Sequence, residues 1–395
     1  MAIAFFITVA KLSHAIEYLF VVLLILWVSV RIRKQDFHFK RTPLDLPILF
    51  FVAWILVTIP FAFDPSYSFA EWRKTILQVL MFYFVVNVIK NESQVKKILI
   101  AFVSGIVLMS VFGIIEHIAK GNSLFDKASH ADSLTQSGKW FSSFLVMGIP
   151  FVWLFFLEGK EKYSKLVAGS LFLIVLAALF LSHTRGAWLA FFAQLTALWL
   201  MWVKNKWLKW SLPVFICGLI LIGGQVIKEN QNSVIQDVPF SDLESMNIRL
   251  DTWTIAFAQI MENPIMGFGY GNHTFQKINE EIIVGSSSVP SLRMHLHNVF
   301  VSMAYGVGLT GFVLFVLIFF FILRMAIQGG QVFRGTFVGN LGLGVFLMVV
   351  GVVSRNMFDN MWVGTLAYLF WLLTGLYFAI WLRVQNTDVG FRQDR

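Results

Sequence analysis

Cysteine and charge are the scarcest features of this 395-residue sequence. The single cysteine, Cys217, lies in an apolar run, which leaves neither a disulfide framework nor a cysteine metal site. Charged residues make up 13% of the chain, whereas hydrophobic residues make up 57% and the mean hydropathy is +0.73. These values lie outside the range of soluble globular proteins and indicate a helical protein that crosses a membrane many times.

The patterns of several other classes are also missing. We expect no cleavable signal peptide, because the first apolar stretch, 2–10, is short and Lys11 interrupts it. The sequence shows no internal repeat, heptad array or low-complexity tract. The net charge of +9 could suggest a nucleic-acid partner, but nineteen of the 31 Lys and Arg residues fall in alternate loops of the predicted topology. Such asymmetry is typical of membrane proteins, so we expect no nucleic-acid partner.

Apolar runs of spanning or near-spanning length recur along the chain. They lie at 15–30, 44–62, 70–89, 98–119, 140–157, 166–182, 187–203, 208–227, 298–323, 337–354 and 362–382. A short or broken further span at 2–14 would place both termini on one side. We therefore predict an all-α polytopic membrane protein with about 12 transmembrane helices.

The basic loops predict the orientation of these spans. They centre on Arg31–Arg41, Lys90–Lys97, Lys160–Lys165, Lys204–Lys209, Arg324–Arg334 and the C-terminal tail. By the positive-inside rule these loops face the cytoplasm. The opposite side then holds short turns and one long segment, 228–297. We expect three parts: N-terminal transmembrane helices over 1–227, a large loop over 228–297 on the non-cytoplasmic side, and C-terminal transmembrane helices with a cytoplasmic tail over 298–395.

The long loop carries a short amphipathic helix, predicted over Ile248–Met261. Its apolar residues share one face: Leu250, Trp253, Phe257 and Ile260/Met261. Such a face can lie on the membrane surface or cover the spans. The helix is expected to end at Asn263-Pro264. The following Gly267-Phe-Gly269-Tyr-Gly271 lacks a flanking strand, so it indicates a backbone bend and not a dinucleotide site.

The loop meets the next apolar run at Arg293-Met-His-Leu-His297-Asn298. No charge occurs from Val299 to Leu323, where Gly306, Gly308 and Gly311 are placed for close helix packing. His297 is therefore expected in the first turn of a membrane helix, where the helix dipole favours the neutral imidazole that a general base needs. The alternative is an interfacial histidine that caps the helix or forms a hydrogen bond.

Three basic positions are expected on the same side of the membrane as His297. Arg185 lies between two spans, where an arginine needs an anionic partner or reaches lipid headgroups. Arg249 is predicted to start the amphipathic helix, the unfavourable end for a cation, so it is placed for an anion or for a surface ion pair with Asp251 or Glu244. Arg73-Lys74 is a weaker candidate, since an interfacial anchor explains it as well.

The histidines also raise the question of a metal. His295 and His297 form an HxH pair, but the sequence offers no obvious third ligand, so we expect no metal site. A carboxylate that orients the imidazole would come from one of four acidic residues between which the sequence does not choose: Glu229, Asp237, Asp242 and Asp251.

Three stretches resemble the O-antigen ligase/polymerase superfamily. They are SHTRGAWLAFF (Ser182–Phe192), IRLDTWTIAFAQIMENPIMGFGYGNHTF (Ile248–Phe275) and HLHNVFVSMAYGVGLTGF (His295–Phe312). The resemblance covers only the second half of the chain. It implies a glycosyltransferase whose donor is a glycan linked to undecaprenyl diphosphate, acting on the periplasmic face of a Gram-negative inner membrane. For a ligase, it implies O-antigen transfer to lipid A-core.

The same resemblance implies roles for individual residues. Arg185 and Arg249 correspond to essential arginines that clamp the diphosphate, and His297 corresponds to the essential histidine. Arg73, Lys74 and Asn298, which adjoins His297, are further candidates for substrate binding. The family ligases are metal-independent, inverting enzymes without a cofactor, and they work among membrane lipids.

Other functions remain as alternatives. O-antigen polymerases carry two large periplasmic loops with RX10G motifs, whereas this sequence has one large loop and none of its expected periplasmic arginines has glycine eleven positions on. Protein O-oligosaccharyltransferases carry a longer C-terminal periplasmic domain. A transporter of an anionic lipid or solute is a more remote alternative, because the repeated halves typical of transporters are not visible.

Overall fold

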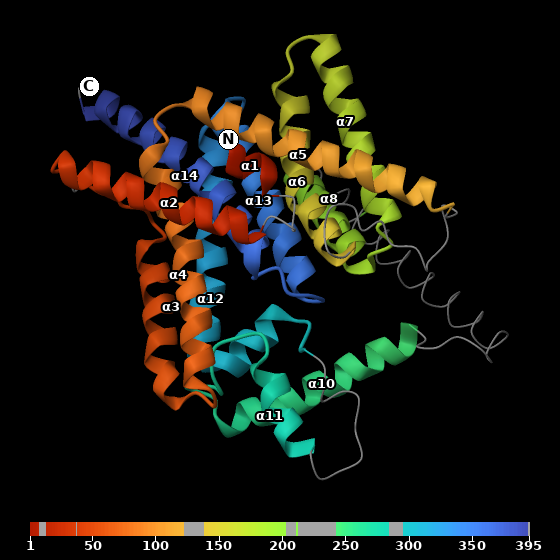
Figure 1. The fold of residues 1–395 in the computed structure, drawn as a ribbon. Coiled ribbons are helices and arrows are strands. Elements are labelled where there is room, and N and C mark those ends of the chain that lie inside the picture. The colour runs from red at the N-terminus through yellow and green to blue at the C-terminus, as the bar shows by residue number, and fades with distance from the viewer. Residues whose placement is uncertain are drawn as a thin grey trace.

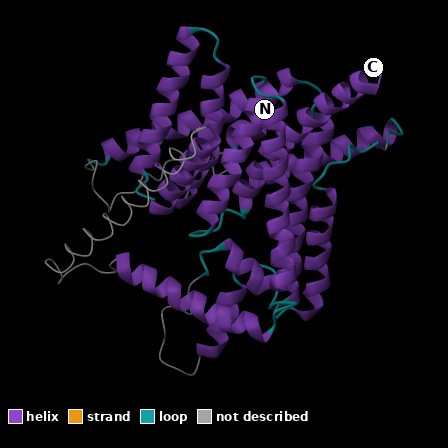
Figure 2. Ribbon diagram, turned by 180° about the vertical axis from the view of Figure 1, so that it is seen from behind, coloured by secondary structure: helices purple, strands orange, loops and turns teal. Residues whose placement is uncertain are grey.

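The computed structural model describes residues 1–7, 13–36, 38–121, 138–202, 211, 242–283 and 295–393. Every regular element in these ranges is a helix, which confirms the all-α prediction for the described part of the chain (Figure 1, Figure 2). The elements are α1 (Ala2–Phe6), α2 (Ser13–Arg33), α3 (Asp45–Thr58), η2 (Ile59–Phe61), α4 (Pro65–Val88), α5 (Glu92–Ala119), α6 (Gly138–Glu158), α7 (Lys162–Leu181), α8 (Arg185–Trp202), α10 (Asp242–Glu262), α11 (Thr274–Ile283), α12 (Val299–Val332), α13 (Phe337–Asn356) and α14 (Gly364–Gln393).

Seven of the described helices are long and apolar enough to cross a membrane. They are α2, α5, α6, α7, α12, α13 and α14. The predicted runs at 44–62, 70–89 and 187–203 correspond to α3 with η2, to α4 and to α8. The run at 208–227 lies outside the described residues apart from Ser211. The described residues thus give seven candidate spans, and the number of about 12 stays a prediction.

Helix α14 lies at the centre of the bundle. In its apolar window 94% of the residues are buried inside the protein, against 11% in α2 at the periphery. Large side chains are buried on all sides of α14, including Trp371 and Tyr377, as expected for a helix that other helices surround. Helix α4 packs against α14, and α13 packs against α6, α8 and α12.

Helices α10 and α11 form a separate layer at one end of the bundle (Figure 1). This layer has its own small core, in which Ala256 and Ile260 of α10 meet Tyr305 of α12. The Trp253 Nε1–H donates a hydrogen bond to the Leu296 carbonyl at 2.7 Å, which ties α10 to the chain entering α12. The layer therefore covers the end of the bundle at which His297 lies.

The predicted start of this amphipathic helix is wrong. It begins at Asp242 and not near Ile248, so Arg249 lies two turns inside it and the helix-dipole argument for that residue fails. The predicted apolar face is only partly buried against the protein. Ile260 is buried and Trp253 is half-buried, whereas Leu250, Phe257 and Met261 are exposed. The predicted end at Asn263 is confirmed.

The structure also corrects the expectation for the glycines of α12. Helical geometry is lost at Val307 and Gly308, and Gly308 has a φ of 70° and a ψ of 176°. The exposed carbonyls at the break accept hydrogen bonds from elsewhere: Tyr305 from Phe268 N, Gly306 from Gly269 N and Val307 from Trp54 Nε1, at 2.8 to 2.9 Å. The Gly267–Gly271 bend is thus docked into a break in α12. The glycines permit this backbone approach, because a side chain at Gly308 would collide with the Ile265 carbonyl.

Candidate functional site

Four segments meet where the α10–α11 layer covers the bundle: the start of α8, the middle of α10, the chain before α12 and the turn after α13. Asn298 caps α12, and its Oδ1 accepts hydrogen bonds from the amides of Phe300 and Val301 at 2.9 and 3.2 Å. His297 precedes this cap and has a φ of 45°, so it lies just before the helix and not in its first turn. A non-glycine residue in the left-handed region is strained unless its surroundings hold it, and such positions are common at functional sites.

The residue that faces His297 is Asp359. His297 Nδ1 lies 3.9 Å from Asp359 Oδ1, and these two side chains are 17% and 18% exposed. The other carboxylate oxygen, Oδ2, accepts a hydrogen bond from Arg355 Nη2 at 2.8 Å. Asp359 therefore links an imidazole on one side to a guanidinium on the other. Asp359 is thus placed to orient the His297 ring.

Arg185, Arg249 and Arg355, with Asp359, form what we call the arginine cluster. Burial is the main cause that lowers the pKa of the Arg249 guanidinium, the charge of Asp359 opposes it, and the charge of Arg185 adds to it. Within the residues that the structure describes, the Nε atoms of Arg249 and Arg355 are buried without a hydrogen-bond partner. The cluster holds three cations against one carboxylate, so it is suited to bind an anion.

Glycine permits the close packing of α8 against Arg355. An ideal Cβ on Gly186 would lie 2.8 Å from Arg355 Nη1, so any side chain at Gly186 would collide with the guanidinium. This contact brings the first turn of α8, where the exposed Arg185 begins the helix, to the end of α13. The position of the SHTRG segment thus depends on its packing against Arg355, in addition to the turn between α7 and α8.

Sequence reasoning missed Asp359 and Arg355. None of the four carboxylates named from the sequence is the one beside His297. Asp251 is exposed on α10, Asp242 begins α10, and Glu229 and Asp237 lie outside the described residues. The available signal was an arginine and an aspartate four residues apart in a short turn on the side of His297.

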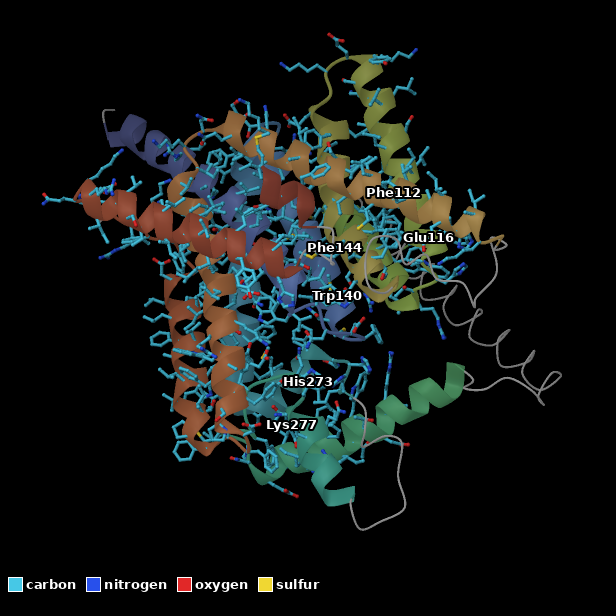
Figure 3. All side chains as sticks on the ribbon, in the orientation of Figure 1. Phe112, Glu116, Trp140, Phe144, His273 and Lys277 are labelled. Carbon is cyan, nitrogen blue, oxygen red and sulfur yellow. The ribbon has the colours of Figure 1, made fainter. Side chains whose placement is uncertain are left out.

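The histidines near this site are not equivalent. His295 and His297 both precede α12. The His295 ring packs edge-on against the His273 ring, with centroids 4.4 Å apart, and it is half-buried and does not project into water. Figure 3 shows His273 where the α11 end of the layer approaches the bundle. Of the two predicted histidines, His297 is the one beside a carboxylate.

The remaining predicted substrate ligands have partners of their own. Arg73 is exposed on α4, with its guanidinium 5.3 Å from the centre of the Phe69 ring. Lys74 forms an ion pair with Glu71 at 2.6 Å. The Asn298 amide oxygen is engaged in the helix cap. Their roles in substrate binding stay predictions.

A cavity of about 270 Å³ lies beside this site, between α2, α4 and the start of α14. We call it the α4–α14 cavity. Its lining includes Lys74, Gln78, Asn272, Trp362 and Thr365. The Asn360 Nδ2 donates a hydrogen bond to the Asn272 Oδ1, so the wall of the cavity touches the residue that follows Asp359.

The described residues contain no group of three or more His, Cys, Asp or Glu side chains placed to hold a metal ion. The site chemistry that can be derived from them rests on guanidinium groups, an imidazole and a carboxylate.

Comparison with known proteins finds a family that matches part of the chain. Residues 170–316 match the family described as O-antigen ligase. The chain carries an O-antigen ligase domain. The superfamily resemblance expected from the sequence is confirmed, and the matched range contains Arg185, Arg249, His297 and Asn298.

Three curated proteins are similar to this chain over most of its length. A Rickettsia bellii protein named "Putative polysaccharide ligase" is 24% identical over 332 residues, which are 80% of this chain and 76% of that protein. A protein of the same name from Rickettsia felis is 20% identical over 85% of this chain and 81% of its own length. The "O-antigen ligase" of Salmonella typhimurium is 26% identical over 63% of this chain and 64% of its own length. Arg355 and Asp359 lie beyond the matched O-antigen ligase domain, so their place in the site rests on the structure alone.

Proposed function

We propose that this chain is an O-antigen ligase that transfers a polysaccharide from undecaprenyl diphosphate to lipid A-core. The observation that carries the proposal is the position of His297, Arg249 and Arg355 around Asp359, with Arg185 near Arg249, within and beside an O-antigen ligase domain. The reaction needs an anion site for the diphosphate and a base for the acceptor hydroxyl. The arginines supply the first and His297 supplies the second.

The arginine cluster binds the leaving group in this proposal. As the bond between the anomeric carbon and the diphosphate oxygen breaks, its electrons pass to the diphosphate, whose negative charge increases. Guanidinium groups stabilise that charge with paired hydrogen bonds and need no metal for it. The partly buried Arg249 and the exposed Arg185 are the two that we assign to the diphosphate, while Arg355 holds Asp359.

His297 activates the acceptor. Its Nδ1 faces Asp359, so its Nε2 is the atom that takes the proton from the attacking hydroxyl. Asp359 keeps the ring oriented and stabilises the imidazolium after the proton transfer, as a carboxylate does in other base–carboxylate pairs. Direct attack by the hydroxyl inverts the configuration at the anomeric carbon.

The ligase is favoured over the related polymerase by the names of the relatives and by the single large loop. Two of the relatives are named as polysaccharide ligases and one as an O-antigen ligase. A transporter is disfavoured by the break in α12. The carbonyls freed there already accept hydrogen bonds from Phe268, Gly269 and Trp54, so they are not available to coordinate a transported ion.

The test is reconstitution with a defined undecaprenyl-diphosphate-linked glycan and lipid A-core in the presence of EDTA. We expect one glycan joined to lipid A-core, with inverted anomeric configuration. Elongation of the donor glycan itself would identify a polymerase, and dependence on an added divalent metal would contradict the proposed chemistry.

The proposal includes a topology with about 12 spans in the bacterial inner membrane and with 228–297 in the periplasm. Single cysteines introduced at 240 and at 36, 162 and 206, in a Cys217→Ser background, test this arrangement by labelling with an impermeant reagent. We expect labelling from outside at 240 alone. Labelling at 162 from the periplasm would reverse the orientation and would place the active site on the wrong face for this donor.

A further inference from the structure

The α4–α14 cavity is lined by groups that suit a sugar. Tyr67, Tyr270, Trp362 and Tyr368 contribute flat rings, and most of the other side chains are hydroxyls, amides and charged groups. Its volume of about 270 Å³ lies just below the range of about 300–1,000 Å³ that is usual for small-molecule sites. The cavity therefore has room for one or two small rings, and it is too small for a lipid chain or a whole polysaccharide.

Three buried polar side chains that line the cavity have an atom without a hydrogen-bond partner among the residues that the structure describes. These atoms are Gln78 Oε1, Trp362 Nε1 and Thr365 Oγ1. The three residues are only 5%, 5% and 1% exposed. Buried polar atoms are almost always hydrogen-bonded, and all three side chains belong to the lining of one cavity, which favours a polar ligand there. Gln78 Oε1 accepts a hydrogen bond, Trp362 Nε1 donates one and Thr365 Oγ1 can do both. A ligand that pairs with all three atoms therefore donates as well as accepts hydrogen bonds, as a sugar hydroxyl does.

The cavity and the arginine cluster differ in the sign of their net charge. Two carboxylates, Glu17 and Glu71, line the cavity against one ammonium, that of Lys74. Lys74 already forms an ion pair with Glu71 at 2.6 Å. A diphosphate would meet net negative charge here, whereas a neutral sugar would not. The cavity is thus unsuited to the leaving group that the arginine cluster is suited to bind.

The cavity also adjoins the proposed base through protein contacts on two sides. Asn272 in its wall accepts a hydrogen bond from Asn360, the neighbour of Asp359. His273 in its wall contacts His295, whose ring centroid is 6.1 Å from that of His297. The cavity lining contains neither Arg185 nor Arg249, which belong to α8 and α10.

We infer that the α4–α14 cavity binds an uncharged sugar ring of the acceptor and thereby presents its hydroxyl to His297. The inference rests on the proposed function for the identity of the ligand as an acceptor, but not for the binding of a neutral sugar. It assigns Gln78, Trp362 and Thr365 to acceptor recognition, separately from the arginines that bind the donor.

The direct test is sugar binding to the purified protein in nanodiscs that contain no sugar-based detergent. The probes are D-glucose, D-galactose and N-acetyl-D-glucosamine, followed by saturation-transfer NMR, with inorganic pyrophosphate as the contrasting anion. We expect at least one sugar to bind the wild-type protein. The double variant Gln78→Leu with Thr365→Val should bind it about 10-fold more weakly, because each lost hydrogen bond is worth about 0.5–1.5 kcal/mol. Pyrophosphate binding should not change.

Helix α14 supplies matched controls for these substitutions. Thr374 and Trp371 are also fully buried, with Thr374 Oγ1 and Trp371 Nε1 unpartnered among the described residues, but neither lines the cavity. Thr374→Val and Trp371→Phe should therefore retain sugar binding, while Trp362→Phe weakens it. The inference is overturned if no probe sugar binds the wild type, or if Thr374→Val weakens binding as much as Thr365→Val.

Kinetics separate this inference from the proposed function. If the protein transfers glycan and Gln78→Leu raises the KM for lipid A-core but not for the donor, both stand. If it transfers glycan and neither KM changes, the cavity inference fails and the ligase function stands. If sugars bind in the cavity but no glycan is transferred to lipid A-core, the ligase function fails, and the cavity remains a sugar site whose role as acceptor site is rejected.

Discussion

The arginine cluster and the α4–α14 cavity are neighbours with opposite chemistry. The cluster holds three guanidinium groups against Asp359, whereas the cavity holds two carboxylates against Lys74 and several hydroxyl and amide groups. His297 lies between them, beside Asp359 and near the His295–His273 contact. The difference suggests that an anionic donor and a neutral acceptor approach the base from different sides. Such a division keeps either substrate from occupying the site of the other.

The largest expected effect belongs to His297, the proposed base. His297→Ala should reduce transfer about 10²- to 10⁴-fold, the usual contribution of a general base, without loss of donor or sugar binding. His295→Ala is the control, because the His295 ring packs edge-on against His273. Transfer rates of the purified variants, measured with donor affinity, check this. Near wild-type transfer by His297→Ala would mean that another group activates the hydroxyl.

Removal of one partner from the Arg355–Asp359 pair should mainly affect stability. Arg355 is 3% exposed in its side chain, so Asp359→Asn leaves a buried cation uncompensated, which typically costs about 3–5 kcal/mol. The double variant Arg355→Met with Asp359→Asn removes the buried charge as well and should recover most of the loss in Tm. Transfer should stay low in the double variant, because His297 has lost its carboxylate. Recovered transfer would show that Asp359 only neutralises Arg355.

Transfer should depend on the guanidinium geometry of Arg185 and Arg249, the proposed donor ligands, and not only on their charge. Arg185→Lys and Arg249→Lys keep the charge but lose the two-pronged hydrogen bond, so each should reduce transfer about 10- to 100-fold, or about 1.5–3 kcal/mol. The KM for the acceptor should be unaffected, in contrast to variants of the cavity. Arg33→Lys is a suitable control, since Arg33 is exposed at the end of α2 and is not a candidate substrate ligand. Wild-type rates in both cluster variants would show that general positive charge is sufficient.

The smallest effect is expected at the ion pair below the cavity, between Lys277 Nζ and Asp64 Oδ2 at 2.6 Å. Figure 3 shows Lys277 on α11, at the outer end of the molecule. The hydrogen bond from Lys277 is the main cause that lowers the pKa of Asp64, and one from the Tyr67 amide adds to it. Both side chains are more than one third exposed, so the pair should contribute only about 0.2–1 kcal/mol.

The sign of its pH dependence follows from that lowered pKa. The folded state favours the ionised Asp64, so the stabilisation is present above the unfolded pKa of about 4 and is lost as the pH falls through the folded pKa. Lys277→Met should therefore lower Tm slightly at pH 7 and have no effect at about pH 2. A difference in Tm that grows on acidification would contradict this assignment.

The three essential residues that the sequence predicted lie within the matched range 170–316. Arg185, Arg249 and His297 were identified from their stretches, and the structure brings Arg249 and Arg185 into electrostatic contact although 64 positions separate them. Asp359 was missed because its partner His297 is 62 positions away, and an arginine–aspartate pair in a short turn is common on protein surfaces.

Other features of the fold depend on contacts that local patterns do not contain. The glycines of α12 are compatible with close helix packing and also with a break in the helix. The break forms because the 264–269 backbone docks there, a contact that the local sequence does not reveal. The three polar residues of the cavity come from α4 and from the chain at the start of α14, and each reads in the sequence as an ordinary residue within or beside an apolar run.

The central claim is that the arginine cluster binds the diphosphate while His297 does the chemistry. The most direct measurement is the affinity of undecaprenyl diphosphate, without sugar and in EDTA, for the wild type, Arg249→Lys and His297→Ala. The account predicts wild-type affinity for His297→Ala together with lost transfer, and about 10- to 100-fold weaker binding for Arg249→Lys. Equal affinity of Arg249→Lys and the wild type would contradict it.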